Sequence, residues 1–340
     1  MTAALASETR LWTTLDFDQD GKRHDWLRLP FSSDLSAYGT IPIPITYVKN
    51  GDGPTALLIA GNHGDEYEGQ VALSKLARQV EPGEVRGRLI VLPALNYPAV
   101  AAGRRLSPLD AGNLNRLFPG DPNGTPTQMI AHYITSVLLP LADLVIDLHS
   151  GGRSLAYLPC CLVRGGTEAE TAWLIELMQV FGAPIGSISD GSGGGGATTL
   201  SAVAQALGVP TLTTELGGGA TFSRPGEAIA TQGLHRVLKH IGVLPNAATE
   251  PAPPVRLMRV DGRGAFTYAP SHGLFEPAAE IGDTVCAGQC AGVLHPIAGP
   301  QQPPTQIRFS QSGLVACRRA PTLTAPGDCL FKLVTDVERM

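Results

Sequence analysis

The sequence predicts an α/β fold in which helices flank a mostly parallel or mixed sheet, followed by a small all-β domain. Between residues 55 and 241, short apolar runs that are typical of buried strands alternate with segments of helical period. After a proline-rich segment, the chain continues in short alternating runs with glycine turns and without helical period. A length of 340 residues, 43% of them hydrophobic and 16% charged, suits one large domain and a smaller one.

The segment before residue 55 is predicted to be β-rich. Residues 41–48 alternate in character, but Pro42 and Pro44 confine this strand to a sheet edge or make it irregular, because proline cannot donate a hydrogen bond to a neighbouring strand. Residues 50–53 (Asn-Gly-Asp-Gly) have the composition of a tight turn, which could join two strands as a hairpin.

From residue 55 onward, strands and helices alternate in the order expected of a parallel sheet covered by helices. Residues 96–127, rich in Asn, Pro and Gly, are predicted to be a long irregular segment, which in a compact domain is usually functional. Residues 191–196 are predicted to be a flexible loop at a pocket rim, and no Gly-Lys-Ser/Thr follows them to make a phosphate-binding loop. The predicted strands are 55–60, 88–92, 141–148, 155–163 and 209–214, and the predicted helices are 68–80, 128–139, 168–181, 198–207 and 228–241.

We divide the chain into a catalytic domain of residues 1–244, a linker of residues 245–254 and a β domain of residues 255–340. The linker is rich in proline and alanine. Residues 273–293 resemble half of a biotinyl/lipoyl-type barrel-sandwich domain. The lysine that such domains carry is absent, and the only lysine after the linker is Lys332, near the chain end. A structural or site-shaping role is therefore favoured over a carrier role.

Composition argues against several classes of function. A formal net charge of −5 does not suit a nucleic-acid partner, which requires a basic surface. No apolar run reaches the roughly 18 residues of a membrane-spanning helix. The N-terminal residues lack the basic start of a signal peptide, so a cytoplasmic protein is expected. The sequence leaves open whether the chain forms a homo-oligomer.

The six cysteines are expected to be buried thiols rather than ligands or disulfides. None belongs to a Cys-x-x-Cys pair, and a reducing cytoplasm disfavours disulfide bonds. A zinc site built from the last four of them is a minor alternative. The cysteines are Cys160, Cys161, Cys286, Cys290, Cys317 and Cys329.

Ionisable side chains directly follow three of the predicted strands. His63 and Glu66 follow the strand at 55–60, His149 follows the strand at 141–148, and Glu215 follows the strand at 209–214. In open α/β sheets, sites lie beyond the carboxyl ends of the strands. Three separate placements on the same edge predict a site there.

His63, Glu66 and His149 are the candidate ligands of a metal ion. A catalytic zinc site needs three protein ligands and one open position for water. Two imidazoles and a carboxylate favour zinc, although other divalent ions accept the same ligand types. Asp147 lies two residues before His149 on the same face of its strand, where it could orient the imidazole or be an ordinary solvated aspartate.

Glu215 is the candidate general base. A metal-activated water needs a group that takes its proton and returns it to the leaving group. An ionisable residue at the end of an apolar strand, followed by three glycines that leave space, suits that role, whereas a lone Glu is usually a turn residue.

Polar groups in the long irregular segment are candidates for substrate binding. Asn115 and Arg116 offer an amide donor and a planar guanidinium that suit a carboxylate. Either Arg104 or Arg105 could polarise the scissile carbonyl and hold the oxyanion, while at least one of the two is surface charge.

Four stretches together resemble the succinylglutamate desuccinylase/aspartoacylase family, which is related in fold to the zinc carboxypeptidases. The resemblance covers roughly residues 40–335. Residues 36–44 (Ser-Ala-Tyr-Gly-Thr-Ile-Pro-Ile-Pro) are similar to the branch that contains N-α-acetyl-diaminobutyrate deacetylase of ectoine breakdown. The four stretches are Gly-Asn-His-Gly-Asp-Glu-Tyr-Glu-Gly at 61–69, Asn-Leu-Asn-Arg-Leu-Phe-Pro at 113–119, Asp-Leu-His-Ser-Gly at 147–151 and Thr-Glu-Leu-Gly-Gly at 214–218.

The resemblance implies one zinc ion per chain and a zinc-carboxypeptidase-like fold. Arg105 is the best match for the family's carbonyl-polarising arginine, although extra residues at 107–112 leave Arg104 as an alternative. Aspartoacylase has an arginine shortly before its catalytic Glu, for the acidic part of its substrate. Residues 197–214 of this chain contain no arginine, so the resemblance favours an acyl amino acid other than N-acetylaspartate. The remaining implied roles are zinc ligation by His63, Glu66 and His149, general base catalysis by Glu215, and carboxylate binding by Asn115 and Arg116.

The predicted function is zinc-dependent hydrolysis of the amide bond of a small N-acyl amino acid, that is, deacylation. Two alternatives stay open: a metallocarboxypeptidase that acts on peptides, and a non-catalytic protein that binds a metal or ligand. The presence of Glu215 beside all three candidate ligands favours an enzyme.

Overall fold

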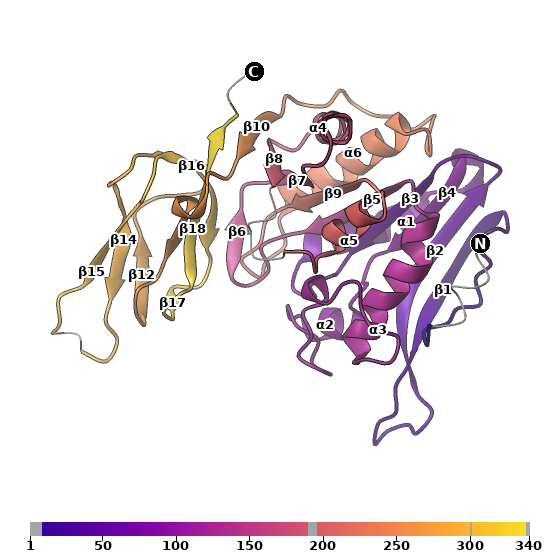
Figure 1. Cartoon of the computed structure of the whole chain (residues 1–340), viewed down its shortest axis with the longest axis horizontal. Coiled ribbons are helices and arrows are strands. Elements are labelled where there is room, and N and C mark those ends of the chain that lie inside the picture. The colour runs from indigo at the N-terminus through magenta and orange to yellow at the C-terminus, as the bar shows by residue number, and fades with distance from the viewer. Residues whose placement is uncertain (1–8, 190–195, 300, 338–340) are drawn as a thin grey trace.

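The computed structural model describes residues 9–189, 196–299 and 301–337. Within them, helices pack on a large mixed sheet, and a second, antiparallel sheet lies toward the C-terminal end (Figure 1). The predicted α/β class is confirmed. Residues 190–195, which include most of the predicted glycine loop, lie outside the described residues.

The large sheet follows the order β1-β2-β4-β3-β5-β9-β7-β8-β10-β18-β16-β13, with β11 paired to β18 and β6 to β16. Its first nine strands in chain order are Gly21–Pro30 (β1), Thr40–Asn50 (β2), Thr55–Ala60 (β3), Gly87–Leu92 (β4), Leu144–His149 (β5), Leu155–Tyr157 (β6), Cys160–Arg164 (β7), Ile185–Ser189 (β8) and Thr211–Glu215 (β9). The α-helices are Tyr67–Gln79 (α1), Tyr97–Ala102 (α2), Pro126–Tyr133 (α3), Glu168–Phe181 (α4), Leu200–Ala206 (α5) and Arg224–His240 (α6).

The strands β4, β3, β5 and β9 run parallel to one another. Every residue of β3 and β5 is buried, which explains their unbroken apolar sequences. Helices α1, α4 and α6 contribute to the apolar core on one face of the sheet, and α3 and α5 to the core on the other. Each fully buried Leu or Ile side chain contributes about 1.5–3 kcal/mol to these cores.

The parallel register brings the ends of three strands together. Ala60 of β3 pairs with Leu148 of β5, and His149 of β5 pairs with Glu215 of β9. The segments that follow β3, β5 and β9 therefore meet at one edge of the sheet, as the sequence predicts.

The strand at 41–48 was predicted to be an edge strand or irregular, and the edge alternative does not hold for the whole strand, because β2 lies between β1 and β4. Its pairing with β4 covers residues 46–50 alone, so among the described residues Pro42 and Pro44 pair with β1 on one side and with no strand on the other. Because proline has no N–H group to donate to a second neighbouring strand, this half of β2 suits a position with a partner on one side alone. The suggested hairpin at residues 50–53 is also wrong, since β4 lies between β2 and β3.

The strand predicted at 155–163 is two strands. Pro159 separates β6, which pairs with β16, from β7, which pairs with β8 and β9. Among the α-helices and strands between residues 55 and 241, two were not predicted: helix α2 inside the segment at 96–127, and strand β8. Helix α2 has six residues and strand β8 has five, so neither is long enough to show a clear periodicity, and tertiary neighbours determine their structure.

The C-terminal part is built of strands with one short 3₁₀ helix among its described residues. Residues 245–254 contain no helix or strand, but β10 pairs in parallel with β8, so the large sheet continues beyond them. The domain boundary there stays a prediction. The strands are Arg256–Arg259 (β10), Phe266–Tyr268 (β11), Gly273–Pro277 (β12), Thr284–Val285 (β13), Cys290–His295 (β14), Thr305–Arg308 (β15), Gly313–Arg319 (β16), Leu323–Thr324 (β17) and Cys329–Asp336 (β18).

The burial of the cysteines follows the prediction in part. Cys160, Cys161 and Cys317 are buried, and burial raises the pKa of each thiol. Cys290 and Cys329 are half-buried. Cys286 is exposed, contrary to the prediction, because it lies in the turn between β13 and β14. Of the helices in the described ranges, none has the length and apolar character of a membrane span.

Candidate metal centre and pocket

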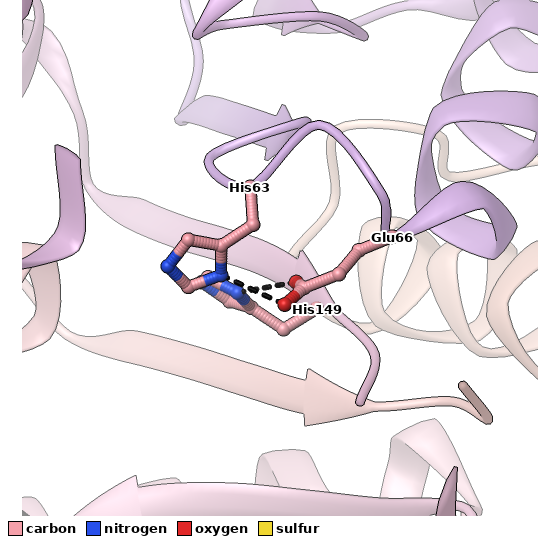
Figure 2. A group of neighbouring side chains, drawn as sticks. All are labelled: His63, Glu66 and His149. Carbon is pink, nitrogen blue, oxygen red and sulfur yellow. Dashed lines mark hydrogen bonds and ion pairs between the residues drawn. The ribbon is translucent and has the colours of Figure 1, made fainter. Parts of the chain in front are cut away.

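His63, Glu66 and His149 meet at the predicted edge of the sheet (Figure 2). One ligand atom from each lies within 4.8 Å of the others, and all three side chains are buried. His63 and Glu66 come from the turn between β3 and α1, and His149 is the last residue of β5. Gly64 in that turn is required for close packing, because a Cβ there would lie 2.0 Å from the backbone of Ala99.

Each imidazole has one nitrogen toward Glu66 and the other toward an orienting oxygen. His63 Nδ1 lies 2.7 Å from Glu66 Oε1, and His63 Nε2 lies 3.0 Å from Asn113 Oδ1. His149 Nδ1 lies 2.8 Å from Glu66 Oε2, and His149 Nε2 lies 2.8 Å from Asp147 Oδ2. The orienting oxygens fix a proton on both Nε2 atoms and direct both Nδ1 atoms at the same carboxylate.

The electrostatics of this group favour positive charge between the imidazoles and Glu66. Burial would raise the pKa of Glu66, but His63 and His149 hold it well below its usual range. Burial would lower the pKa of His149, but Asp147 and Glu66 outweigh that effect and raise it well above its usual value. The backbone N–H of Ser150 also donates to Glu66 Oε2, at 3.2 Å.

This arrangement fits a divalent metal ion. With a proton fixed on each Nε2, the contact between Nδ1 and a carboxylate oxygen is satisfied by a further proton or by a cation that both atoms share. Two imidazole nitrogens and one carboxylate are a borderline donor set that suits zinc. The described residues contain no other cluster of His, Cys, Asp and Glu with this spacing.

The two candidate arginines differ in position. Arg105 Nη1 lies 3.4 Å from Glu66 Oε1 and 3.2 Å from His63 Nδ1, and the side chain lines the pocket. Arg104 is exposed, and its backbone oxygen accepts from Gly64 N–H at 2.8 Å. The geometry favours Arg105 as the group that faces a substrate.

Asn115 and Arg116 both line the pocket, on a short 3₁₀ turn at residues 114–116. Asn115 Oδ1 accepts from Leu200 N–H at 2.9 Å, which fixes its side-chain amide toward His149. Arg116 Nη1 donates to the backbone oxygen of Asn115 at 2.7 Å. No carboxylate within the described residues pairs with this guanidinium, so it is free to bind an anion.

Glu215, the last residue of β9, is half-buried in the same pocket. Its Oε2 is buried without a hydrogen-bond partner among the described residues. Burial and the neighbouring charge of Glu66 raise the pKa of Glu215 to about 8. The glycines after it allow close approach: a Cβ on Gly218 would lie 2.1 Å from the backbone oxygen of Leu155.

A cavity of about 430 Å³ contains the whole candidate site. It brings together all seven residues that the sequence singled out for metal, catalytic and substrate roles. It also contains groups that sequence analysis did not assign, because they lie on strands from distant parts of the chain. These include Tyr157 on β6, Phe266 and Tyr268 on β11, Cys317 on β16 and Lys332 on β18.

Asn113 is a further residue that sequence analysis did not assign. It belongs to the Asn-Leu-Asn-Arg stretch on which the resemblance rests, and that membership was the available signal. Its contact with His63 Nε2 gives the first imidazole the same kind of support that Asp147 gives His149.

Comparison with known proteins identifies the family of this chain. Residues 52–241 match the family model of the succinylglutamate desuccinylase/aspartoacylase catalytic domain. The chain is 38% identical over 331 residues to the N-alpha-acetyl-L-2,4-diaminobutyric acid deacetylase of Halomonas elongata, an alignment that covers 96% of this chain and 95% of the relative.

Two solved structures are similar over nearly their whole length. The product-bound structure of the ectoine utilization protein EutE (DoeB) from Ruegeria pomeroyi has 40% identity and a TM-score of 0.91, covering 96% of this chain and 99% of that one. The succinylglutamate desuccinylase/aspartoacylase from Rhodobacter sphaeroides has 39% identity and a TM-score of 0.90, covering 97% of this chain and 100% of that one.

Proposed function

Because the chain belongs to the succinylglutamate desuccinylase/aspartoacylase family, we propose that it is a zinc-dependent deacylase that hydrolyses the amide bond of a small N-acyl amino acid. One observation carries the proposal. Two imidazoles, each oriented through Nε2, direct Nδ1 at the Glu66 carboxylate, and Glu215 stands in the same cavity with one oxygen unpaired.

His63, Glu66 and His149 would hold the zinc ion, which when bound supplies Lewis acidity toward water and the amide carbonyl. The Glu215 carboxylate accepts a proton from the attacking water and later donates it to the nitrogen of the leaving amine. Arg105 Nη1 donates to the carbonyl oxygen and stabilises the negative charge that develops there. Asn115 and Arg116 bind the free carboxylate of the substrate.

The relatives suggest which substrate to test first. The Halomonas elongata protein is named for deacetylation of N-α-acetyl-L-2,4-diaminobutyric acid, and the Ruegeria pomeroyi protein for ectoine utilization. We therefore propose an N-acetylated diamino acid as the substrate of this chain. A cavity of about 430 Å³ is of a size suited to such a molecule.

The test is a panel of substrates. Zinc-loaded protein is incubated with N-acetyl, N-succinyl and N-formyl amino acids, including N-α-acetyl-L-2,4-diaminobutyrate, and the free amine released is measured. We expect turnover of the N-acetyl diamino acid above the rest. Release of C-terminal residues from peptides, without action on acylated amino acids, would instead identify a carboxypeptidase. Bound zinc without turnover in either assay would identify a binding protein.

A further inference from the structure

One wall of the pocket is a row of four residues aligned across β6 and three strands of the C-terminal part. Phe266 of β11 pairs with Lys332 of β18, Lys332 with Cys317 of β16, and Cys317 with Tyr157 of β6. All four residues line the cavity that contains the candidate metal ligands. Tyr157 N–H donates to the Gly217 backbone oxygen at 3.0 Å, which ties this wall to the segment after Glu215.

Lys332 is the charged member of this row, and within the described residues its ammonium group forms no salt bridge, although its charge opposes the rise in the pKa of Glu215. Nζ of Lys332 lies 5.8 Å from the centroid of the Tyr157 ring, near the outer limit of a cation–π interaction. The side chain is half-buried. It lines the site cavity and two adjoining cavities of about 460 and 210 Å³. A half-buried ammonium group that faces open cavities is placed to meet an anion.

The charges in the pocket agree with that placement. Arg105 lies against Glu66, which leaves Arg116 and Lys332 as cations and Glu215 as the carboxylate around the rest of the cavity. Arg116 and Lys332 both line the cavity of about 210 Å³ that also contains Glu215 and Tyr157. Two unpaired cations and one carboxylate leave a surplus positive charge, which complements a substrate that carries a carboxylate.

We propose that Lys332 binds the carboxylate on the amino-acid part of the substrate, opposite Arg116, so that the C-terminal strands take part directly in substrate selection. This inference rests on the proposed deacylase function, because it specifies the substrate's charge at the same site. Lys332 is then a specificity-determining residue, and the C-terminal part is more than a structural addition to the catalytic sheet.

The test compares Lys332→Met and Lys332→Arg with wild type on two substrates, an N-acetyl amino acid and its neutral carboxamide. We expect Lys332→Met to raise KM for the carboxylate substrate about 10- to 100-fold and to change KM for the carboxamide less than about threefold. Lys332→Arg should restore most of the loss, since it keeps the charge. Lys239→Met, a change of the same kind at an exposed helix position, should alter neither value.

Three results would overturn the proposal. An equal loss on both substrates would mean that Lys332 acts through Glu215 or through folding, and no loss on either would mean that it binds nothing. The third is a loss that Lys332→Arg does not restore. If wild type hydrolyses neither substrate, the proposed function fails instead. Calorimetry then measures the binding of the same two molecules to wild type and to Lys332→Met. The proposal stands if wild type prefers the carboxylate form and Lys332→Met has lost that preference, and it fails if the preference is unchanged.

Discussion

His149 is held from both sides, with Asp147 Oδ2 at 2.8 Å from Nε2 and Glu66 Oε2 at 2.8 Å from Nδ1. Asp147 and His149 lie two residues apart on the same face of β5, so a single buried strand supplies both the candidate ligand and the group that orients it. The tautomer of the imidazole therefore follows from the strand itself.

The first prediction concerns Asp147. Asp147→Asn should weaken zinc affinity about 10- to 100-fold, because an amide orients the imidazole less firmly and adds no negative charge. Competition with a chromophoric chelator measures the affinity. Asp143→Asn is the matched control at the other end of the strand, where the carboxylate accepts from Thr55 N–H at 2.7 Å and lies outside the site. Equal zinc affinity in Asp147→Asn and wild type would contradict the orienting role.

The second prediction separates two adjacent arginines. Arg105→Met should lower kcat about 10²- to 10³-fold, because the donor to the developing oxyanion is lost. Arg104→Met should stay within about threefold of wild type, since that side chain is exposed and lies outside the lining of the cavity. Steady-state kinetics on the best substrate of the panel decide between them. A larger loss in Arg104→Met would transfer the role to that residue.

The third prediction concerns stability and pH in metal-free protein. The pKa of Glu215 is raised from 4.5 to about 8, so the folded state holds this proton more tightly than the unfolded state does. The stability that results is complete below the unfolded pKa and is lost as pH rises through the folded value. Near the unfolded pKa of 4.5, Glu215→Gln and wild type should therefore have similar free energies of unfolding. At about pH 9, the free energy of unfolding of Glu215→Gln should exceed that of wild type by on the order of 1–3 kcal/mol.

Denaturant unfolding across this pH window, in the presence of a chelator, measures the difference. Glu227 provides a control of opposite sign, because its hydrogen bonds with Thr231 and Lys75 lower its pKa despite partial burial. Glu227→Gln should be less stable than wild type by a constant amount at every pH above the unfolded pKa, and the difference should disappear as pH falls through the lowered folded pKa. If Glu215→Gln stabilised the protein equally at every pH, the ionisation of Glu215 would not be the cause of the difference.

The site edge could be predicted from sequence because each candidate group directly follows a strong strand signal. The strands β3, β5 and β9 are parallel, so their carboxyl ends had to meet, and the order of the motifs was sufficient to bring His63, His149 and Glu215 together. The choice between Arg104 and Arg105 could not be made from their adjacent positions in the chain. It depended on which side chain turns into the cavity.

The pocket wall that contains Tyr157 and Lys332 could not be predicted. Tyr157 and Lys332 are brought together through the pairing of β6 with β16 and of β16 with β18, and β6 lies far from both of these strands in the chain. Antiparallel pairing between distant strands has no local sequence signal, and a shift of one residue would turn Lys332 to the other face. The parallel pairing of β10 with β8 across the predicted linker also joins strands that lie far apart in the chain, so it has no local sequence signal either.

The central claim is that Glu215 moves the proton at a zinc site formed by His63, Glu66 and His149. The most direct measurement is zinc content and turnover of Glu215→Gln beside wild type, on the same N-acyl amino acid. We predict that the variant keeps one zinc ion per chain and that kcat falls by about 10³-fold or more. Turnover close to that of wild type in zinc-loaded Glu215→Gln would contradict the claim.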